Sequence, residues 1–286
     1  MLTKKIIINA DDFGIHESVN SGIINGFRRG CISSTTLMAG AGAFDQAVAL
    51  AADNPGLGLG VHLTLVGEVT VAPPAAVASL VDHNGRLPQA YSRFLQLFTA
   101  GRIRLADIRR ELEAQVNKVA ATGLSITHLD SHQHMHVVPQ VMDIVLDIAK
   151  QFQIKAVRIP AEPIFFLGGF PCTIGRFIGR GGLSVLASIA RSKARKAGIK
   201  TTDHFYGMLA GGNMTEPYLL NIISQLPYGI SEIMVHPGAD DTAMTNEYGW
   251  SYNWQAELAA VTSGSVASRL AQEQIQRITF GELIHE

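Results

Sequence analysis

The sequence has few cysteines, almost no net charge and no long apolar run, and each shortage excludes a class of protein. The only two cysteines in its 286 residues, Cys31 and Cys172, cannot form a disulfide framework or a thiolate zinc site. Lys and Arg total 23 against 24 Asp and Glu, so the net charge of −1 creates no field that would attract nucleic acid. No apolar run reaches membrane-spanning length, and the first five residues show no secretory pattern. We therefore expect a cytoplasmic protein without a nucleic-acid partner.

Histidine, by contrast, is concentrated in one place. Four of the ten histidines lie in the ten-residue run Thr127–His136. Imidazole is a common metal ligand and clustered histidines bring no obvious packing advantage, so the run indicates a metal site in preference to a polar loop. If the run were extended, His132, His134 and His136 would share one face, but neighbouring residues rarely aim three imidazoles at one ion. We expect one or two ligands from this run and the others from elsewhere.

Two earlier apolar runs also contain or end in polar residues. Asp11 and Asp12 follow Ile6–Ile8, which reads as a buried strand, and adjacent carboxylates repel unless a cation or a proton separates them. His62 interrupts the apolar run Leu57–Leu65. Each has a structural alternative, because an aspartate pair can cap a helix and a lone histidine in a strand is more often a hydrogen-bonded core residue.

Short β-branched runs alternate with longer helical patterns, which is typical of repeated βα units around a mainly parallel sheet. A chain of this length with 47% hydrophobic residues can bury one large core. The predicted strands are Ile6–Ala10, Ser34–Ala39, Leu57–Leu65, Thr127–Asp130, Ala156–Ile159, Glu232–His236 and Gln276–Thr279. The predicted helices are Glu17–Arg29, Phe44–Ala52, Ala106–Ala121, Gln140–Phe152, Glu216–Gln225 and Trp254–Val261.

If these strands close into a barrel, their carboxyl ends meet at one rim, where barrel enzymes place their chemistry. The residues that fall at such ends are Asp11, Asp12, His62, His132 and His236. Their coincidence at one rim favours a shared site over five separate structural roles.

Four motifs along the chain carry a resemblance to a known family. The segments Asn9–Gly14, Gly60–Leu63, Thr127–His136 and Val235–Gly238 resemble the YdjC-like carbohydrate deacetylases, in the same order and across nearly the whole chain. This family includes the chitooligosaccharide deacetylase of chitobiose utilisation and the hopanoid-biosynthesis deacetylase-like proteins. The resemblance implies a distorted seven-stranded (β/α) barrel of the glycoside hydrolase/deacetylase type, forming one domain over residues 1–286. It also implies that the protein removes the acetyl group from an N-acetylated amino sugar by hydrolysis.

By the same resemblance, Asp12, His62 and His132 would hold one divalent metal ion, Asp11 would be the catalytic base and His236 the catalytic acid. Amide hydrolysis needs such parts, because water is a poor nucleophile and an amide nitrogen must be protonated before it leaves. Two imidazoles suit zinc, whereas magnesium prefers oxygen ligands and water, so both Mg²⁺ and Zn²⁺ stay open. The structural alternative for His236 is a cap before the following Pro-Gly turn.

Three further polar residues have less specific roles. Arg158 is a charge within a β-like run, so we expect it to orient Asp11, to contact substrate or to form a structural salt bridge. Asp130 and His134 fit a shell of residues that orients metal ligands, with ordinary loop hydrogen bonding as the alternative.

Residues 164–200 form an apolar and basic segment, which we predict to be a helical insert. Its charged residues are all basic: Arg176, Arg180, Arg191, Lys193, Arg195, Lys196 and Lys200. Such a segment could lie on an anionic membrane surface, at the inner face of the membrane, or could be a helical cap with a solvated basic face. The hopanoid-associated branch is similar in this respect, so a lipid-linked N-acetylglucosamine stands beside a chitooligosaccharide as the expected substrate.

Three functions therefore stay open: the deacetylase, a metal-dependent phosphoesterase on the same site, and a non-catalytic, metal-dependent carbohydrate-binding protein. A base and an acid beside the metal favour an enzyme, and a single metal centre disfavours the usual two-metal phosphoesterase. The sequence leaves open the sugar, the chain length and whether the protein forms a homo-oligomer.

Overall fold

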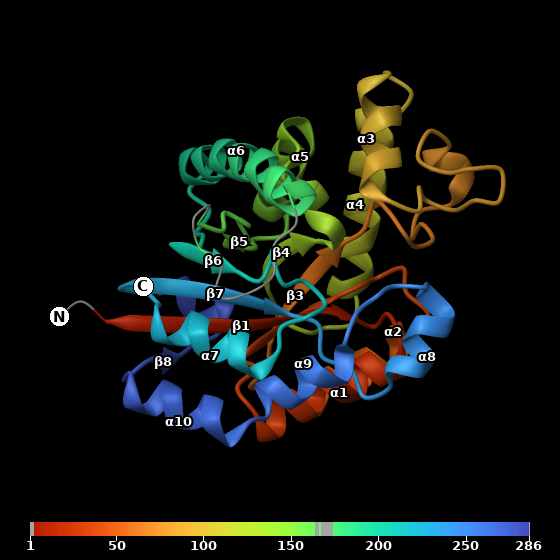
Figure 1. Ribbon diagram of the computed structural model, residues 1–286. Coiled ribbons are helices and arrows are strands. Elements are labelled where there is room, and N and C mark those ends of the chain that lie inside the picture. The colour runs from red at the N-terminus through yellow and green to blue at the C-terminus, as the bar shows by residue number, and fades with distance from the viewer. Residues whose placement is uncertain (1–2, 164–165, 167–173, 286) are drawn as a thin grey trace.

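A parallel sheet forms the centre of the protein (Figure 1). The computed structural model describes residues 3–163, 166 and 174–285, and only the backbone of residues 174–181. In these ranges seven strands lie in the order β5-β4-β3-β2-β1-β7-β6, and every pairing is parallel. Their bounds are β1 Lys4–Phe13, β2 Ser34–Leu37, β3 Gly58–Leu63, β4 Ile126–Ser131, β5 Ala156–Val157, β6 His204–Tyr206 and β7 Gly229–Val235.

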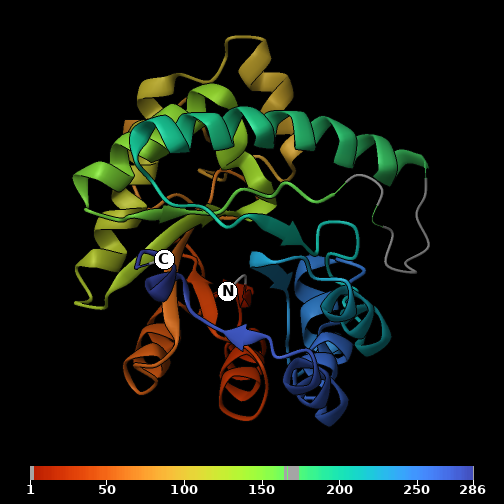
Figure 2. The ribbon, with the colours of Figure 1, turned by 90° about the vertical axis from the view of Figure 1, so that its left-hand side faces the viewer.

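The sheet curls until its two ends nearly meet (Figure 2). The amide of Val157 donates to the carbonyl of Lys200 (3.0 Å), just before β6, and the amide of Lys200 donates to the carbonyl of Lys155 (2.8 Å). This confirms the predicted α/β class and the distorted seven-stranded barrel. One predicted strand is shorter than expected and lies outside the barrel path: Gln276–Thr279 forms the two-residue β8 (Gln276–Arg277), which pairs with β1 beside the seven-strand order. The seventh place belongs to β6, which was not predicted because three residues are too few to show a period.

Helices lie on the outer side of the curled sheet (Figure 2). Their bounds are α1 Glu17–Arg29, α2 Phe44–Ala52, α3 Tyr91–Thr99, α4 Leu105–Ala120, α5 Pro139–Gln151, α6 Ile174–Ala197, α7 Glu216–Ser224, α8 Asp241–Tyr248, α9 Trp254–Val261, α10 Gly264–Gln272 and α11 Phe280–Leu283. Two 3-10 helices, η1 (Pro74–Val77) and η2 (His132–Val137), lie between them. The six predicted helices all exist, with ends within one residue of the prediction, whereas α3, α8, α10 and α11 were not predicted. None of the helices described is long and apolar enough to cross a membrane.

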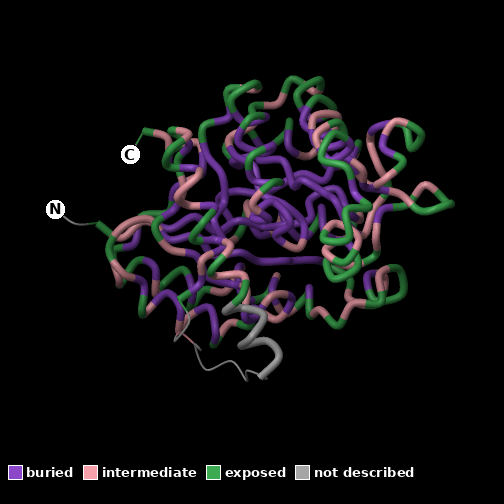
Figure 3. Tube along the Cα trace, turned by 90° about the horizontal axis from the view of Figure 1, so that it is seen from above, coloured by how far each residue is buried: buried purple, intermediate pink, exposed green. Residues whose placement is uncertain are grey.

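The interior of the barrel is apolar at one end and polar at the other. Alternate residues of a strand point to opposite faces, so Ile7, Asn9 and Asp11 of β1 share the inner face. Ile7 packs with Ile278 and Phe280, which close the amino end of the barrel, and all three are buried. The buried parts of the chain lie mainly at the centre of the molecule, and the exposed parts at its periphery (Figure 3). The polar side chains of β1 and its neighbours therefore gather toward the carboxyl ends of the strands.

Candidate metal centre and active site

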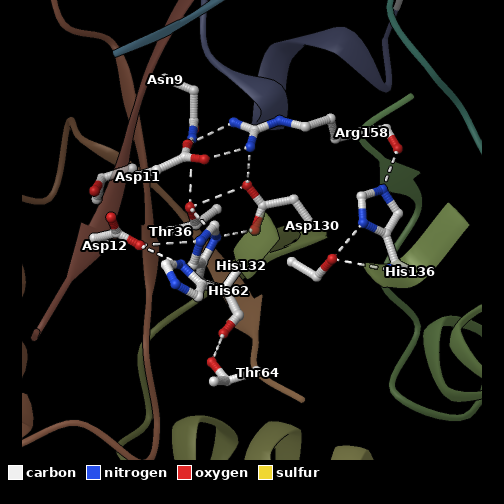
Figure 4. Close-up of polar contacts among 12 residues, drawn as sticks. Asn9, Asp11, Asp12, Thr36, His62, Thr64, Asp130, His132, His136 and Arg158 are labelled. Atoms are coloured by element: carbon white, nitrogen blue, oxygen red, sulfur yellow. Dashed lines mark hydrogen bonds and ion pairs between the residues drawn. The ribbon is translucent and has the colours of Figure 1, made fainter. Parts of the chain in front are cut away.

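Three side chains from separate strands converge at the carboxyl end of the barrel. Asp12 is the last residue but one of β1, His62 lies in β3 and His132 follows β4. Asp12 Oδ1 lies 3.2 Å from His62 Nε2 and 3.0 Å from His132 Nδ1. All three side chains are buried, and their ligand atoms lie within 4.8 Å of one another. The structure thus brings together the three residues expected to hold a metal (Figure 4).

This donor set fits a divalent cation. Two ligands held about 2.1 Å from an ion at a right angle lie about 3.0 Å apart, close to the two spacings observed here. A carboxylate and two imidazoles match the usual ligands of zinc, and three protein ligands leave positions for water or substrate. The site therefore suits a catalytic cation better than a closed structural one.

A backbone bulge separates the two adjacent aspartates. The β1–β2 register shifts between Ala10 and Phe13, and Asp12 adopts a left-handed φ of 65°, which Asp tolerates better than most residues. Asp11 consequently points toward Arg158, whereas Asp12 points toward the two histidines (Figure 4). The capping alternative for this pair is wrong, because α1 is capped by His16, whose Nδ1 accepts from the Ser18 amide.

Asp130 holds His62 from the side opposite Asp12. His62 Nδ1 lies 2.7 Å from Asp130 Oδ1, and the Thr36 hydroxyl donates to Asp130 Oδ2 (3.1 Å). A carboxylate on Nδ1 fixes the ring orientation and leaves Nε2 directed at Asp12, an arrangement typical of metal-binding histidines. Burial lowers the pKa of His62, but Asp130 and Asp12 outweigh it and raise this pKa to about 10. A cation binding here would therefore have to displace a tightly held proton.

A single buried guanidinium connects the polar interior. Arg158 is fully buried and donates to both carboxylate oxygens of Asp11, with Nη1–Oδ2 and Nη2–Oδ1 distances of 2.6 and 2.7 Å. Its Nη1 also lies 2.7 Å from Asp130 Oδ2, and its Nε donates to Glu232 Oε1 at 2.7 Å. Arg158 thus lies against three carboxyl groups, and this geometry orients Asp11.

The sequence reasoning missed Glu232. It lies on the inner face of β7, fully buried, with Oε2 lacking a hydrogen-bond partner. Burial raises the pKa of Glu232 to about 7, despite the opposing effect of Arg158. Glu232 shares Arg158 with the carboxyl groups of Asp11 and Asp130, so a proton on Glu232 reduces the negative charge around this guanidinium. The strand alternation was the available signal, because Glu232 and His236 are four residues apart and share the inner face.

His236 lies just beyond the end of β7 and is 7% exposed. Its backbone amide donates to Glu257, and its Nδ1, which has no hydrogen-bond partner, lies 3.9 Å from Glu257 Oε2. Glu257, also missed from sequence, is fully buried within α9 and accepts a bond from the Met214 amide. His236 does not cap the next helix, since Asp240 caps α8.

A cavity of about 770 Å³ connects these groups. Its polar wall contains Asp11, His62, His132, Gln133, His134 and His236. Much of the remaining wall is aliphatic: Leu95, Met135, Val137, Val138, Leu183, Leu186, Met208, Leu209 and Met234. The cavity therefore has room for a ligand larger than an acetyl group beside the candidate metal centre.

The other histidines of the Thr127–His136 run have different surroundings. The run is extended only to Ser131 and continues as η2, so the shared face considered for His132, His134 and His136 does not form. His134 lines the cavity, with its ring against Phe205 at a centroid distance of 5.9 Å. His136 lies near the Arg158 carbonyl (Nε2–O 2.9 Å), and His128 stacks on Phe280 away from the site.

Helix α6 covers most of the predicted insert. Leu183 and Leu186 line the cavity, whereas Val185 is 63% exposed. Lys193 pairs with Asp143 at 2.6 Å, and Arg191 donates to the Asp203 carbonyl at 2.8 Å. These two side chains already have partners within the protein. Arg195 and Lys196 are exposed, and Cys172 lies outside the described residues.

Comparison with known proteins identifies the family. The model of the YdjC-like protein family matches residues 5–272. The chain belongs to the YdjC-like family. It is 32% identical over 280 residues to a carbohydrate deacetylase of Brevibacillus brevis, covering 98% of this chain and 99% of the relative. It is also 32% identical over 282 residues to a chitooligosaccharide deacetylase of Yersinia pestis, covering 95% and 96% of the two chains.

A solved structure also resembles this YdjC-like protein over its length. The crystal structure of a candidate cellobiose-phosphate cleavage protein from Enterococcus faecalis V583 matches it with a TM-score of 0.78 at 25% identity. The match covers 98% of this chain and 99% of the other. Sequence and structure comparisons therefore agree with the fold and with the family expected from the four motifs.

Proposed function

We propose that the protein is a metal-dependent deacetylase of N-acetylated amino sugars, acting by hydrolysis. The observation that carries the proposal is the convergence of Asp12, His62 and His132 on one buried point, with Asp11 and His236 at the same cavity. The names of the curated relatives, a carbohydrate deacetylase and a chitooligosaccharide deacetylase, support the same substrate class. A divalent cation at this point, Mg²⁺ or Zn²⁺, would polarise the acetyl oxygen and make a bound water more acidic.

Asp11 is proposed as the catalytic base. Arg158 and Asn9 donate to its carboxylate, at 2.6 to 2.9 Å, and hold it in one orientation at the cavity wall. Each carboxylate oxygen has two lone pairs, so Asp11 can still accept a proton from the attacking water. Arg158 is proposed to position this base, because its guanidinium is fully buried and does not line the cavity.

His236 is proposed as the catalytic acid. It lines the cavity just beyond the end of β7, the neighbour of β1 in the sheet, and its backbone amide donates to Glu257. A protonated His236 would donate to the sugar nitrogen as its bond to the acetyl carbon breaks, which prevents the amine from leaving as an anion. Glu257, 3.9 Å from Nδ1, can compensate the charge of that protonated ring. Asp130 and His134 are proposed to orient His62 and to contact substrate, respectively.

The aliphatic part of the cavity favours a lipid-linked amino sugar over a free one. Leu183 and Leu186 of α6 contribute to that wall, and the same helix exposes Val185 and Ile189 by 63% and 41%. An apolar wall beside a sugar site suits an alkyl group attached to the sugar. We therefore propose a cytoplasmic enzyme that contacts the inner membrane surface through α6. We propose residues 1–286 as one domain.

The direct test is acetate release by purified protein from N-acetylglucosamine, di-N-acetylchitobiose and an N-acetylglucosaminyl lipid in detergent. Metal-depleted protein should be inactive, and adding back Mg²⁺, Zn²⁺ or Co²⁺ one at a time would identify the ion. A phosphate-ester substrate in the same assay tests the phosphoesterase alternative. Binding of all three acetylated sugars without acetate release, at full metal content, would instead support a carbohydrate-binding protein.

A further inference from the structure

Four aromatic side chains form a continuous strip along one side of the site. They occupy every second position from the last residue of α8 to the first residue of α9, and each ring contacts the next: Tyr248, Trp250, Tyr252 and Trp254. Successive ring centroids lie 5.0, 5.5 and 5.4 Å apart, with interplanar angles of 40 to 48°. We call this set the aromatic strip.

The two middle rings contact the two ends of the proposed reaction centre. Trp250 stacks on His132, with centroids 5.5 Å apart and planes 26° apart. Tyr252 meets the edge of His236 at a centroid distance of 5.3 Å and lines the cavity. The strip therefore connects a candidate metal ligand with the candidate acid, and its Tyr252 ring lines the cavity.

The fold fixes the aromatic strip in place. The Tyr248 hydroxyl donates to the Ile15 carbonyl (3.0 Å), and Trp254 is 1% exposed at the start of α9. Behind Tyr252 lies Gly212, at a φ of 77°, where an added Cβ would collide with the tyrosine ring. The Asn253 amide also donates to the Gly212 carbonyl at 2.7 Å. Tyr252 is thus held from behind while another part of its ring lines the cavity.

We infer that Tyr252 is the stacking surface for the sugar ring whose nitrogen carries the acetyl group, and so determines specificity for a pyranose. This inference rests on the proposed deacetylation. The scissile amide must lie between the metal centre and His236, so the attached ring must lie beside the strip that joins them. The C–H groups on one face of a pyranose form an apolar surface that packs on an aromatic ring, while its hydroxyls stay at the edge. Tyr91 also lines the cavity, but it lies at the start of α3 and is 55% exposed, outside the aromatic strip.

The experiment tests the binding of the two reaction products, acetate and the amino sugar, separately. Acetate probes the metal centre alone, whereas the deacetylated dimer of glucosamine probes the sugar surface. For Tyr252→Ala we expect the KM for di-N-acetylchitobiose to rise about tenfold with kcat within about twofold, because stacking binds substrate and transition state alike. The Kd of the glucosamine dimer, from calorimetry, should rise by a similar factor, while acetate inhibition and metal content stay unchanged. Tyr252→Phe should restore both constants, and Tyr228→Ala, at a side chain 59% exposed elsewhere, should behave as wild type.

Two outcomes would overturn the inference. One is unchanged affinity of Tyr252→Ala for the glucosamine dimer. The other is an equal loss of affinity for acetate and for the dimer, which would show general damage to the site. If the wild-type protein releases no acetate from any sugar, the proposed function fails, and the dimer calorimetry still decides whether Tyr252 binds a sugar ring.

Discussion

Replacing Glu232 by Gln should make the protein more stable at alkaline pH and little changed in acid. Glu232 is fully buried, its Oε1 accepts from Arg158 Nε at 2.7 Å, and its Oε2 has no partner. Gln keeps the shape and the accepting oxygen, so the bond to Arg158 can persist. The substitution removes a carboxyl group that can ionise close to the carboxylates of Asp11 and Asp130, which contact the same guanidinium.

The sign and size follow from the pKa. Burial raises the pKa of Glu232 from 4.5 to about 7, so the folded protein retains a proton that the unfolded chain releases. Its contribution to stability is therefore complete below pH 4.5 and is lost as the pH rises through 7. Because one pKa unit corresponds to about 1.4 kcal/mol, the difference between these two pKa values sets a limit of roughly 3 kcal/mol. Between pH 5 and pH 8 the wild-type protein should lose about 2–3 kcal/mol relative to Glu232→Gln.

Urea unfolding of both proteins at pH 5, 6, 7 and 8, at equal metal content, measures this difference. Comparing the two proteins at each pH cancels the titration of groups that do not interact with Glu232. Glu113→Gln, at a side chain 32% exposed on α4, should show no such pH-dependent gain. A Glu232→Gln protein that is equally destabilised at pH 5 and pH 8 would refute the reasoning, because it would show that the ionised carboxylate is the form held by Arg158.

Four other predictions concern the metal, the base and the membrane. His132→Ala should lose most bound metal by elemental analysis; wild-type content would remove His132 from the ligand set. Asp130→Asn should weaken metal affinity about 10- to 100-fold in a chelator competition, because His62 loses its orienting partner. Asp11→Asn should keep the metal and lose about 10²–10⁴-fold in kcat; a metal-free variant with normal stability would mean that the two aspartates exchange roles. Arg195→Gln with Lys196→Gln should weaken binding to anionic vesicles about 30-fold at low salt, because each basic residue contributes about 1 kcal/mol, without changing turnover of a soluble sugar. Wild-type protein that binds no vesicles would reduce α6 to a structural cap.

The sequence predicted the main features of the barrel because its strands and helices carry strong local patterns. Ile6–Ile8 is apolar on both faces, and the structure buries all three residues. Elements with weak patterns were missed, such as the three-residue strand β6, which holds its place through pairing with β7. The Gln276–Thr279 pattern was real, but only long-range packing could place its strand outside the seven.

The candidate metal residues could be predicted because they lie at strand ends, where the barrel brings distant segments together. The residues that support them are less visible in the sequence. Glu257 lies within a helix, and nothing in its local pattern indicates that it accepts the His236 amide across the fold. The aromatic strip had a visible spacing of two, but the sequence could not indicate that it packs on His132 and His236.

Backbone conformation explains why a list of histidines and aspartates did not give the site directly. Of the five residues other than glycine with positive φ in the described chain, Asp12, Gln133 and His134 lie at or next to candidate ligands. Each such residue costs about 1–3 kcal/mol, so surrounding contacts must impose it. Gln133 accepts from the Tyr91 amide at 2.9 Å, and these contacts hold the turn in which η2 leaves the strand direction. Regular alternation would have kept His132, His134 and His136 on one face. The left-handed turn at Gln133 and His134 separates them, so His132 reaches Asp12 and His134 contributes to the cavity wall.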